Sequence, residues 1–126
     1  AAKKIESLES NFHAKSIDEL RLNHCSLFKK FSVTSDETKV LDLSNTAICT
    51  LSPSIGHLLS LEKLDLSGSN VESLPKNIKN LSMLTWLQLE ACKKLVSLPE
   101  LPPSLKNLYL NECKELMSLP NLPSSL

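Results

Sequence analysis

A six-residue pattern that ends in Leu-x-Leu recurs five times along this chain and constrains its fold more than any other feature. Its first position is leucine in three units, Ile17 in one and Thr38 in another. The middle leucines are separated by 21, 23, 23 and 21 residues, at Leu20, Leu41, Leu64, Leu87 and Leu108. A fixed period of about 20 to 50 residues is typical of repeat architectures, in which each unit buries its apolar face against its neighbours. The chain is therefore predicted to be one array of similar units.

The remainder of each unit repeats as well, which predicts a single domain over residues 1–126. Leu51–Leu58 matches Leu74–Leu81, and both end in Ile-x-x-Leu, whereas two later units carry a proline-rich ending that is two residues shorter. We expect a partial repeat at 1–16 and full repeats that start near 17, 38, 61, 84 and 105. The chain is interpreted as a segment of a longer array, whose uncapped apolar ends favour self-association.

Each pattern predicts a short strand that pairs in parallel with the strand of the next unit. Because side chains alternate between the two faces of a strand, the last two leucines of each pattern face a continuous core. The expected fold class is α/β: a curved solenoid with a concave parallel sheet of about five strands. The convex side is expected to be mostly irregular, 3-10 helical or polyproline-like, because proline fixes φ and lacks an N–H donor.

Composition and charge exclude several classes of function. Lys+Arg and Asp+Glu are both 14, so the chain lacks the cationic excess that nucleic-acid binding requires. No apolar run approaches the ~20 residues of a membrane span. Gly56 and Gly68 are the only glycines, so no glycine-rich phosphate loop is present. The histidines, His13, His24 and His57, fall in different registers, so we expect no catalytic, cofactor or metal site.

Three of the four cysteines share one register, three residues after the last strand leucine. Cys25, Cys92 and Cys113 are interpreted as buried small residues that donate weakly to the turn backbone, since Thr46 and Ser69 fill the same register elsewhere. A disulfide between Cys92 and Cys113 is the alternative, because strand spacing permits it. The fourth cysteine, at position 49, is off register and is expected to be an exposed thiol.

The strand residues that point outward are the candidate binding residues. Two columns are expected on the concave face: Glu19, Val40, Lys63, Trp86 and Asn107 at the third strand position, and Arg21, Asp42, Asp65, Gln88 and Tyr109 at the fifth. All of these residues except Val40 form the candidate protein-binding site. The chain's only Trp, Tyr and Arg all lie here, and those types dominate interaction hot spots.

Trp86 and Tyr109 are expected to be diagonal neighbours about 7–8 Å apart, within reach of aromatic contact. We interpret them as a binding patch, although aromatic residues also suit strands for structural reasons alone. Asp42 and Asp65 lie in one column of an open sheet, which favours a solvated charge ladder over a catalytic acid–base pair.

The repeating residues are similar to a known family. Leu105-x-x-Leu108-x-Leu110-x-x-Cys113, followed by Leu116-x-x-Leu119-Pro, resembles the leucine-rich repeat of plant intracellular nucleotide-binding disease-resistance proteins. The blocks 25–35, 40–48 and 61–75 resemble the class that carries a Toll/interleukin-receptor (TIR) domain. This resemblance implies a module without enzymatic activity or cofactor that recognises a pathogen protein or a guarded host protein. It also implies intramolecular restraint of the nucleotide-binding domain, and a location in the cytoplasm, with the nucleus as an alternative.

Two other functions stay open at this point. Leu98-Pro-Glu-Leu-Pro-Pro-Ser-Leu105 also resembles the short repeats of bacterial effectors, in which the array would direct a ligase domain to its substrates. Those arrays keep a nearly constant unit, whereas this chain mixes units of two lengths. The segment could alternatively be a structural spacer with an inert concave face.

Overall fold

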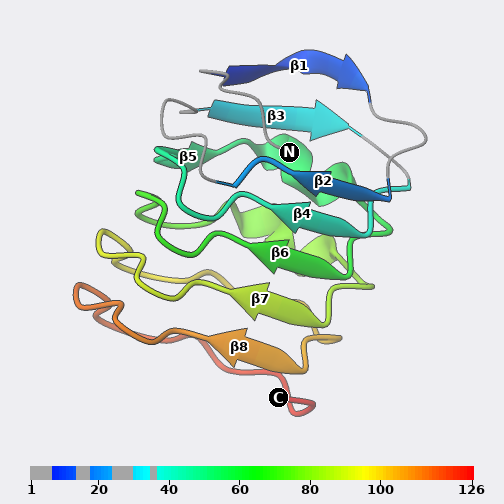
Figure 1. Cartoon of the computed structure of the whole chain (residues 1–126). Coiled ribbons are helices and arrows are strands. Elements are labelled where there is room, and N and C mark those ends of the chain that lie inside the picture. The colour runs from blue at the N-terminus through cyan, green and yellow to red at the C-terminus, as the bar shows by residue number, and fades with distance from the viewer. Residues whose placement is uncertain (1–6, 14–17, 24–29, 35–36) are drawn as a thin grey trace.

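The computed structural model describes residues 7–13, 18–23, 30–34 and 37–126. Five of its strands form one parallel sheet in the order β2-β4-β6-β7-β8. Their bounds are β2 Glu19–Arg21, β4 Val40–Asp42, β6 Lys63–Asp65, β7 Trp86–Gln88 and β8 Asn107–Tyr109. Figure 1 shows these strands stacked in sequence order, one from each unit. The predicted parallel sheet of five strands is therefore confirmed, while its curvature stays a prediction.

The register of this sheet is the one that the leucine pattern predicts. Leu41 pairs with Leu64, Leu64 with Leu87, and Leu87 with Leu108, so equivalent residues form straight rows across the strands. In the middle of the array the inward leucines are fully buried: Leu41, Leu43, Leu64, Leu66, Leu87 and Leu89. At the edge strands Leu20, Leu108 and Leu110 are only partly buried against the same core. Each interior unit thus depends on both neighbours to cover its leucines.

A second parallel sheet, which we did not expect, lies on the opposite side of the first units. It has the order β1-β3-β5 and comprises β1 Ser7–His13, β3 Lys30–Thr34 and β5 Thr50–Leu51. Its register pairs Leu8 with Phe31 and Phe31 with Leu51. The equivalent leucines of later units, Leu74, Leu98 and Leu119, are each followed by proline, which cannot donate to a ladder. This sheet therefore ends where proline enters the units.

Two 3-10 helices, η1 Pro53–His57 and η2 Lys76–Asn80, occupy the same side of the repeats that start near 38 and 61. They correspond to the Ile-x-x-Leu endings, and Ile55 and Ile78 are buried. The proline-rich units that follow are irregular, as predicted. The described residues contain no α-helix, so the helical part of the expected α/β class consists of 3-10 turns.

Strands β4, β6, β7 and β8 are each followed by a turn residue in the left-handed conformation. These residues are Asn45 (φ 56°), Gly68 (φ 71°), Ala91 (φ 57°) and Glu112 (φ 64°). The first three direct their backbone N–H to a carbonyl of the next unit, at N···O distances of 2.7 to 2.9 Å. The left-handed conformation points the N–H toward the next unit, and Ala91 adopts it even though this conformation is unfavourable for alanine.

Side chains add hydrogen bonds between consecutive units. Cys92 Sγ donates to Leu66 O (3.1 Å) and Cys113 Sγ to Leu89 O (2.9 Å). Ser104 Oγ donates to Leu81 O (3.4 Å), and Ser125 Oγ to Pro103 O (2.9 Å). All four donors reach backward to a backbone carbonyl of the preceding unit, so the units are joined along two seams besides the sheet.

Candidate functional site

The outward residues of the five-stranded sheet form the candidate site, here called the outer face. The structure places the two expected columns in register. Glu19, Val40, Lys63, Trp86 and Asn107 align as partners across the strands, and so do Arg21, Asp42, Asp65, Gln88 and Tyr109. Every one of these ten residues is exposed or half-buried, while their strand neighbours at the middle position are buried or packed on the core.

Two aromatic rings form the apolar part of the outer face. The Trp86 and Tyr109 ring centroids are 5.0 Å apart, with the rings tilted by 44°. The predicted diagonal contact is therefore present, and tilted pairs at this distance are favourable beyond their area burial. Lys63 Nζ lies 5.1 Å from the Trp86 ring centroid, within cation–π range. The indole is thus held between a cation and a second ring.

A chain of hydrogen bonds fixes the edge of the indole ring. Trp86 Nε1 donates to Gln88 Oε1 (3.1 Å), and Gln88 Nε2 donates to Glu90 Oε1 (2.7 Å). Asn111 Nδ2 reaches Glu90 Oε2 at 3.4 Å. Both ends of the Gln88 amide are occupied, so Trp86 is oriented before any ligand arrives. Sequence reasoning did not identify Glu90 and Asn111, although they continue the outward alternation past the strand ends.

The carboxylates of the outer face serve the turns that follow their strands. Asp42 Oδ1 accepts from Ser44 N (3.0 Å) and Ser44 Oγ (2.7 Å), and Asp65 Oδ1 accepts from Ser67 N (2.9 Å). The sequence signal was the repeated Asp-Leu-Ser, in which aspartate bonds a backbone N–H two residues onward. The two side chains are therefore held by their turns rather than simply solvated.

Arg21 connects the first strand to the second. Arg21 Nη2 and Nε contact Glu19 Oε1 at 2.8 and 3.0 Å, and Nη1 lies 3.6 Å from Asp42 Oδ2. The hydrogen bonds and charge of Glu19 raise the pKa of Arg21, so this guanidinium stays charged at all working pH values. Asn107, at the other edge of the sheet, is the half-buried register partner of Trp86.

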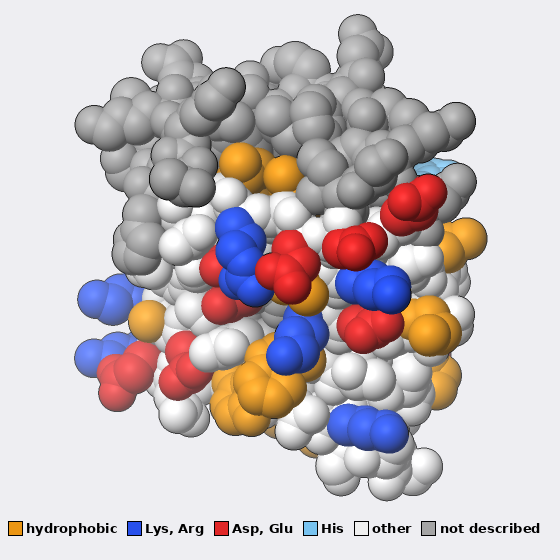
Figure 2. Space-filling model, turned by 45° about the vertical axis from the view of Figure 1, so that its right-hand side comes forward, with side chains coloured by type: hydrophobic (Ala, Val, Ile, Leu, Met, Phe, Trp, Pro, Cys, Tyr) orange, Lys and Arg blue, Asp and Glu red, His pale blue; other side chains and the backbone are white. Residues whose placement is uncertain are grey.

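A hollow of about 200 Å³ lies between the charged and aromatic parts of the outer face. Its lining residues come from four strands: Arg21, Val40, Leu41, Asp42, Lys63, Asp65, Trp86 and Gln88. Figure 2 shows acidic and basic side chains gathered beside a hydrophobic cluster on this side of the molecule. The small Val40 side chain stands between larger neighbours in its column, which accounts for the hollow. The face can therefore receive a projecting side chain.

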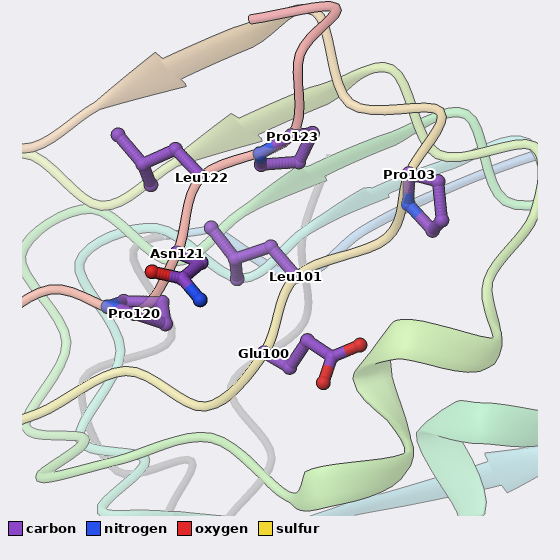
Figure 3. Close-up of a pocket in the computed structure, with 7 residues that line it drawn as sticks. All are labelled: Glu100, Leu101, Pro103, Pro120, Asn121, Leu122 and Pro123. Carbon is purple, nitrogen blue, oxygen red and sulfur yellow. The ribbon is translucent and has the colours of Figure 1, made fainter.

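A larger hollow of about 520 Å³ lies between the proline-rich segments of the last two units. Figure 3 shows that Leu101 and Leu122, from successive segments, lie beside each other there, with Asn121 and Glu100 as the polar groups. It combines one carboxylate with leucine and proline side chains and has no aromatic residue. It therefore lacks the fixed aromatic and charged groups of the outer face.

The described cysteines behave as structural residues. Cys92 is buried and Cys113 half-buried, both donate to backbone carbonyls, and burial raises the pKa of each thiol. Cys49, Cys92 and Cys113 are all free, so the alternative of a disulfide between Cys92 and Cys113 is wrong. Cys49 is exposed, as predicted. Cys25 lies outside the described residues.

The described part of the chain holds no group of three or more His, Cys, Asp or Glu side chains arranged to bind a metal ion. His57 is exposed at the end of η1, and His24 falls outside the described ranges. None of the described helices is long and apolar enough to cross a membrane.

Comparisons with known proteins match this chain to a repeat family and to plant proteins. The family described as Leucine Rich Repeat matches residues 60–81. The chain is 40% identical over 86 residues to TMV resistance protein N of Nicotiana glutinosa, covering 64% of this chain and 8% of that protein. It is 46% identical over 68 residues to disease resistance-like protein DSC1 of Arabidopsis thaliana (54% of this chain, 6% of that protein).

A third relative covers more of the chain. Disease resistance protein RPS4B of Arabidopsis thaliana is 36% identical over 108 residues, which are 82% of this chain and 9% of that protein. The chain thus spans less than a tenth of the length of each of these relatives.

Proposed function

Because this chain belongs to the leucine-rich-repeat regions of TIR-class plant disease-resistance proteins, we propose that it is a protein-recognition module of an immune receptor. Its outer face binds a protein ligand, either a pathogen effector or a guarded host protein. In the parent protein it also contacts the nucleotide-binding domain and keeps that domain inactive. The module works in the cytoplasm or the nucleus and carries out no chemical step.

The observation that carries this proposal is the fixed aromatic pair on the outer face. Tryptophan and tyrosine contribute most to binding when they are central and already oriented, because little side-chain entropy is then lost on association. Trp86 is restrained on its edge by Gln88, on its ring by Lys63 and at its side by Tyr109. A structural spacer does not require an exposed aromatic pair that is fixed in this way.

The proposed mechanism is a shift between two states of the parent receptor. In one state the module contacts the nucleotide-binding domain, and in the other it holds its ligand. A ligand shifts this equilibrium only by the difference between its affinities for the two states. Moving the receptor from about 1:99 to 99:1 requires a preference near 10⁴-fold. A ligand that competes for the same aromatic pair would provide that preference.

The test is a quantitative capture experiment with the 126-residue chain in plant cytosol supplemented with candidate pathogen proteins. The parent chain is compared with Trp86→Ala/Tyr109→Ala. The matched control, Met83→Ala/Val96→Ala, removes two exposed apolar side chains outside the outer face. We expect a partner that the parent and control retain and the aromatic variant loses, at equal melting temperature.

Two results would contradict the proposal. Equal capture by all three chains would place the binding surface elsewhere. Capture by none, with the parent's nucleotide-binding domain also tested, would favour a structural spacer.

A further inference from the structure

We propose that the hollow between Arg21 and Trp86 binds an arginine side chain of the protein partner, held by the carboxylates of Asp65 and Asp42. This inference rests on the proposed recognition function and names the chemical group that the outer face selects. It follows from the charges around the hollow, from the register of the two aspartates, and from the shape of the hollow.

The charges around the hollow are incompletely paired. Arg21 bridges Glu19 and Asp42, so on the first two strands one cation serves two carboxylates. Asp65 occupies the equivalent position one strand further, yet no described cation forms an ion pair with it. Lys63, on the same strand, is directed to the Trp86 ring instead. Arg21 and Lys63 both line the hollow, yet each is engaged elsewhere, so the Asp65 carboxylate has no described ion-pair partner.

The register of the sheet places the Asp42 and Asp65 carboxylates close enough to repel each other. Asp42 and Asp65 are direct partners on adjacent strands, which lie about 4.8 Å apart. Like charges at opposed positions destabilise a sheet. The carboxylates cannot easily turn away from each other, because one oxygen of each is fixed by the following turn. Asp42 Oδ2 already lies 3.6 Å from Arg21 Nη1, whereas the second oxygen of Asp65 has no such partner among the described residues. A cation placed beside Asp65, within reach of Asp42, therefore relieves this repulsion and gains a charge-assisted contact.

The shape and lining of the hollow favour arginine over lysine. A planar guanidinium can bridge two carboxylates with parallel N–H donors, and it packs well against an aromatic ring. Val40 provides a small apolar floor for the methylene stem, and Trp86 forms a wall. The hollow of about 200 Å³ is lined by Arg21 and Lys63 as well as by Asp42, Asp65 and the indole, so the guanidinium enters on the Asp65 side with its stem over Val40.

The probe is N-acetyl-arginine amide, a single arginine side chain without charged termini. Trp86 is the only tryptophan, so its indole N–H resonance in NMR spectra reports on the hollow without interference. We expect the resonance to shift saturably with this probe, with a dissociation constant in the millimolar range, and to recover with added salt. N-acetyl-citrulline amide, which has nearly the same shape without the charge, should give no saturable shift.

Two variants test the role of Asp65. Asp65→Asn removes the charge and keeps an oxygen that can accept from Ser67 N, so the turn is preserved. It should weaken binding of the arginine probe at least about tenfold. Glu62→Gln is the matched control: it removes a carboxylate next to the same strand, outside the residues that line the hollow, and should leave the affinity within about twofold.

Equal shifts from arginine and citrulline, or unchanged affinity in Asp65→Asn, would overturn the proposal. These outcomes are separate from those of the capture experiment, because the probe needs no partner protein. If a partner is captured through the aromatic pair and arginine does not bind, the recognition function stands and the arginine site is wrong. If arginine binds and no partner is captured, the site stands and the recognition function is wrong.

Discussion

The left-handed turn residues allow a stability prediction whose sign is unusual for a surface substitution. Ala91 has φ of 57°. An L-residue in this conformation costs about 1–2 kcal/mol, because Cβ approaches the following carbonyl oxygen. Ala91→Gly removes that cost, but glycine loses about 0.4–1 kcal/mol more conformational entropy on folding. The difference predicts that Ala91→Gly stabilises the chain by about 0.5–1 kcal/mol.

The reverse substitution at the equivalent turn is the matched comparison. Gly68 has φ of 71°, and a Cβ added there would press against Asn45 Oδ1. Gly68→Ala therefore acquires both the conformational cost and a steric conflict, and we expect destabilisation of about 1–2 kcal/mol or more. Both substitutions keep the backbone N–H that links to the next unit.

The assay is equilibrium unfolding in urea, followed by far-ultraviolet circular dichroism and by Trp86 fluorescence. Coincident transitions establish that the array unfolds as one unit, which repeat proteins do not always do. At constant slope, the midpoint should rise for Ala91→Gly and fall for Gly68→Ala. A lower midpoint for Ala91→Gly would refute the reasoning, because relief of backbone strain at the turn would then be smaller than the entropy that glycine loses on folding.

Four other outcomes follow from the packing. Leu87→Ala should cost about 2–5 kcal/mol in the same assay, because this leucine is fully buried between two units. Met83 fills the register of Ser104 and Ser125 with an exposed side chain, so Met83→Ser should add a bond to the preceding unit and stabilise by about 0.5–1 kcal/mol. Burial raises the pKa of the Cys92 thiol above its value in the unfolded chain. The stability that comes from this difference is complete below about pH 8.5 and is lost as pH rises through the folded pKa. Between pH 8 and 10 the free energy of unfolding should therefore fall more for the parent than for Cys92→Thr. Finally, Leu119 is 50% exposed where the equivalent Leu98 is 8% exposed. Because exposed apolar surface favours self-association, light scattering should detect a mass that increases with protein concentration.

The five-stranded sheet could be predicted from the sequence because its signal is redundant. Leucines at fixed positions determine both the strand register and the outward columns, so the contact between Trp86 and Tyr109 followed from the position of each residue in its unit. The turn bonds of Asp42 and Asp65 were not foreseen, because they depend on a serine two residues onward rather than on the leucine period. The hydrogen bond from Gln88 to Glu90 was not foreseen either, because Glu90 lies beyond the end of β7.

The second sheet was missed for a different reason. Lys30–Thr34 lies in a region where the repeat pattern is weak, and its aromatic and β-branched residues favour a strand. The expectation of an irregular side came from the proline-rich units, whose composition does not represent the first units. A period averaged over an array therefore predicts what the units share and overlooks how the early units differ.

The bonds between units have a consequence for how such arrays change during evolution. Cys92 and Cys113 each donate to the backbone of the preceding unit, and the backbone carbonyl that receives each bond exists whatever the side chain there. A unit can therefore be duplicated, deleted or exchanged by recombination without losing its attachment. The residues that make the outer face distinctive, such as Lys63 and Trp86, take no part in these attachments. New binding surfaces can thus be assembled from existing units while the scaffold that carries them is inherited intact.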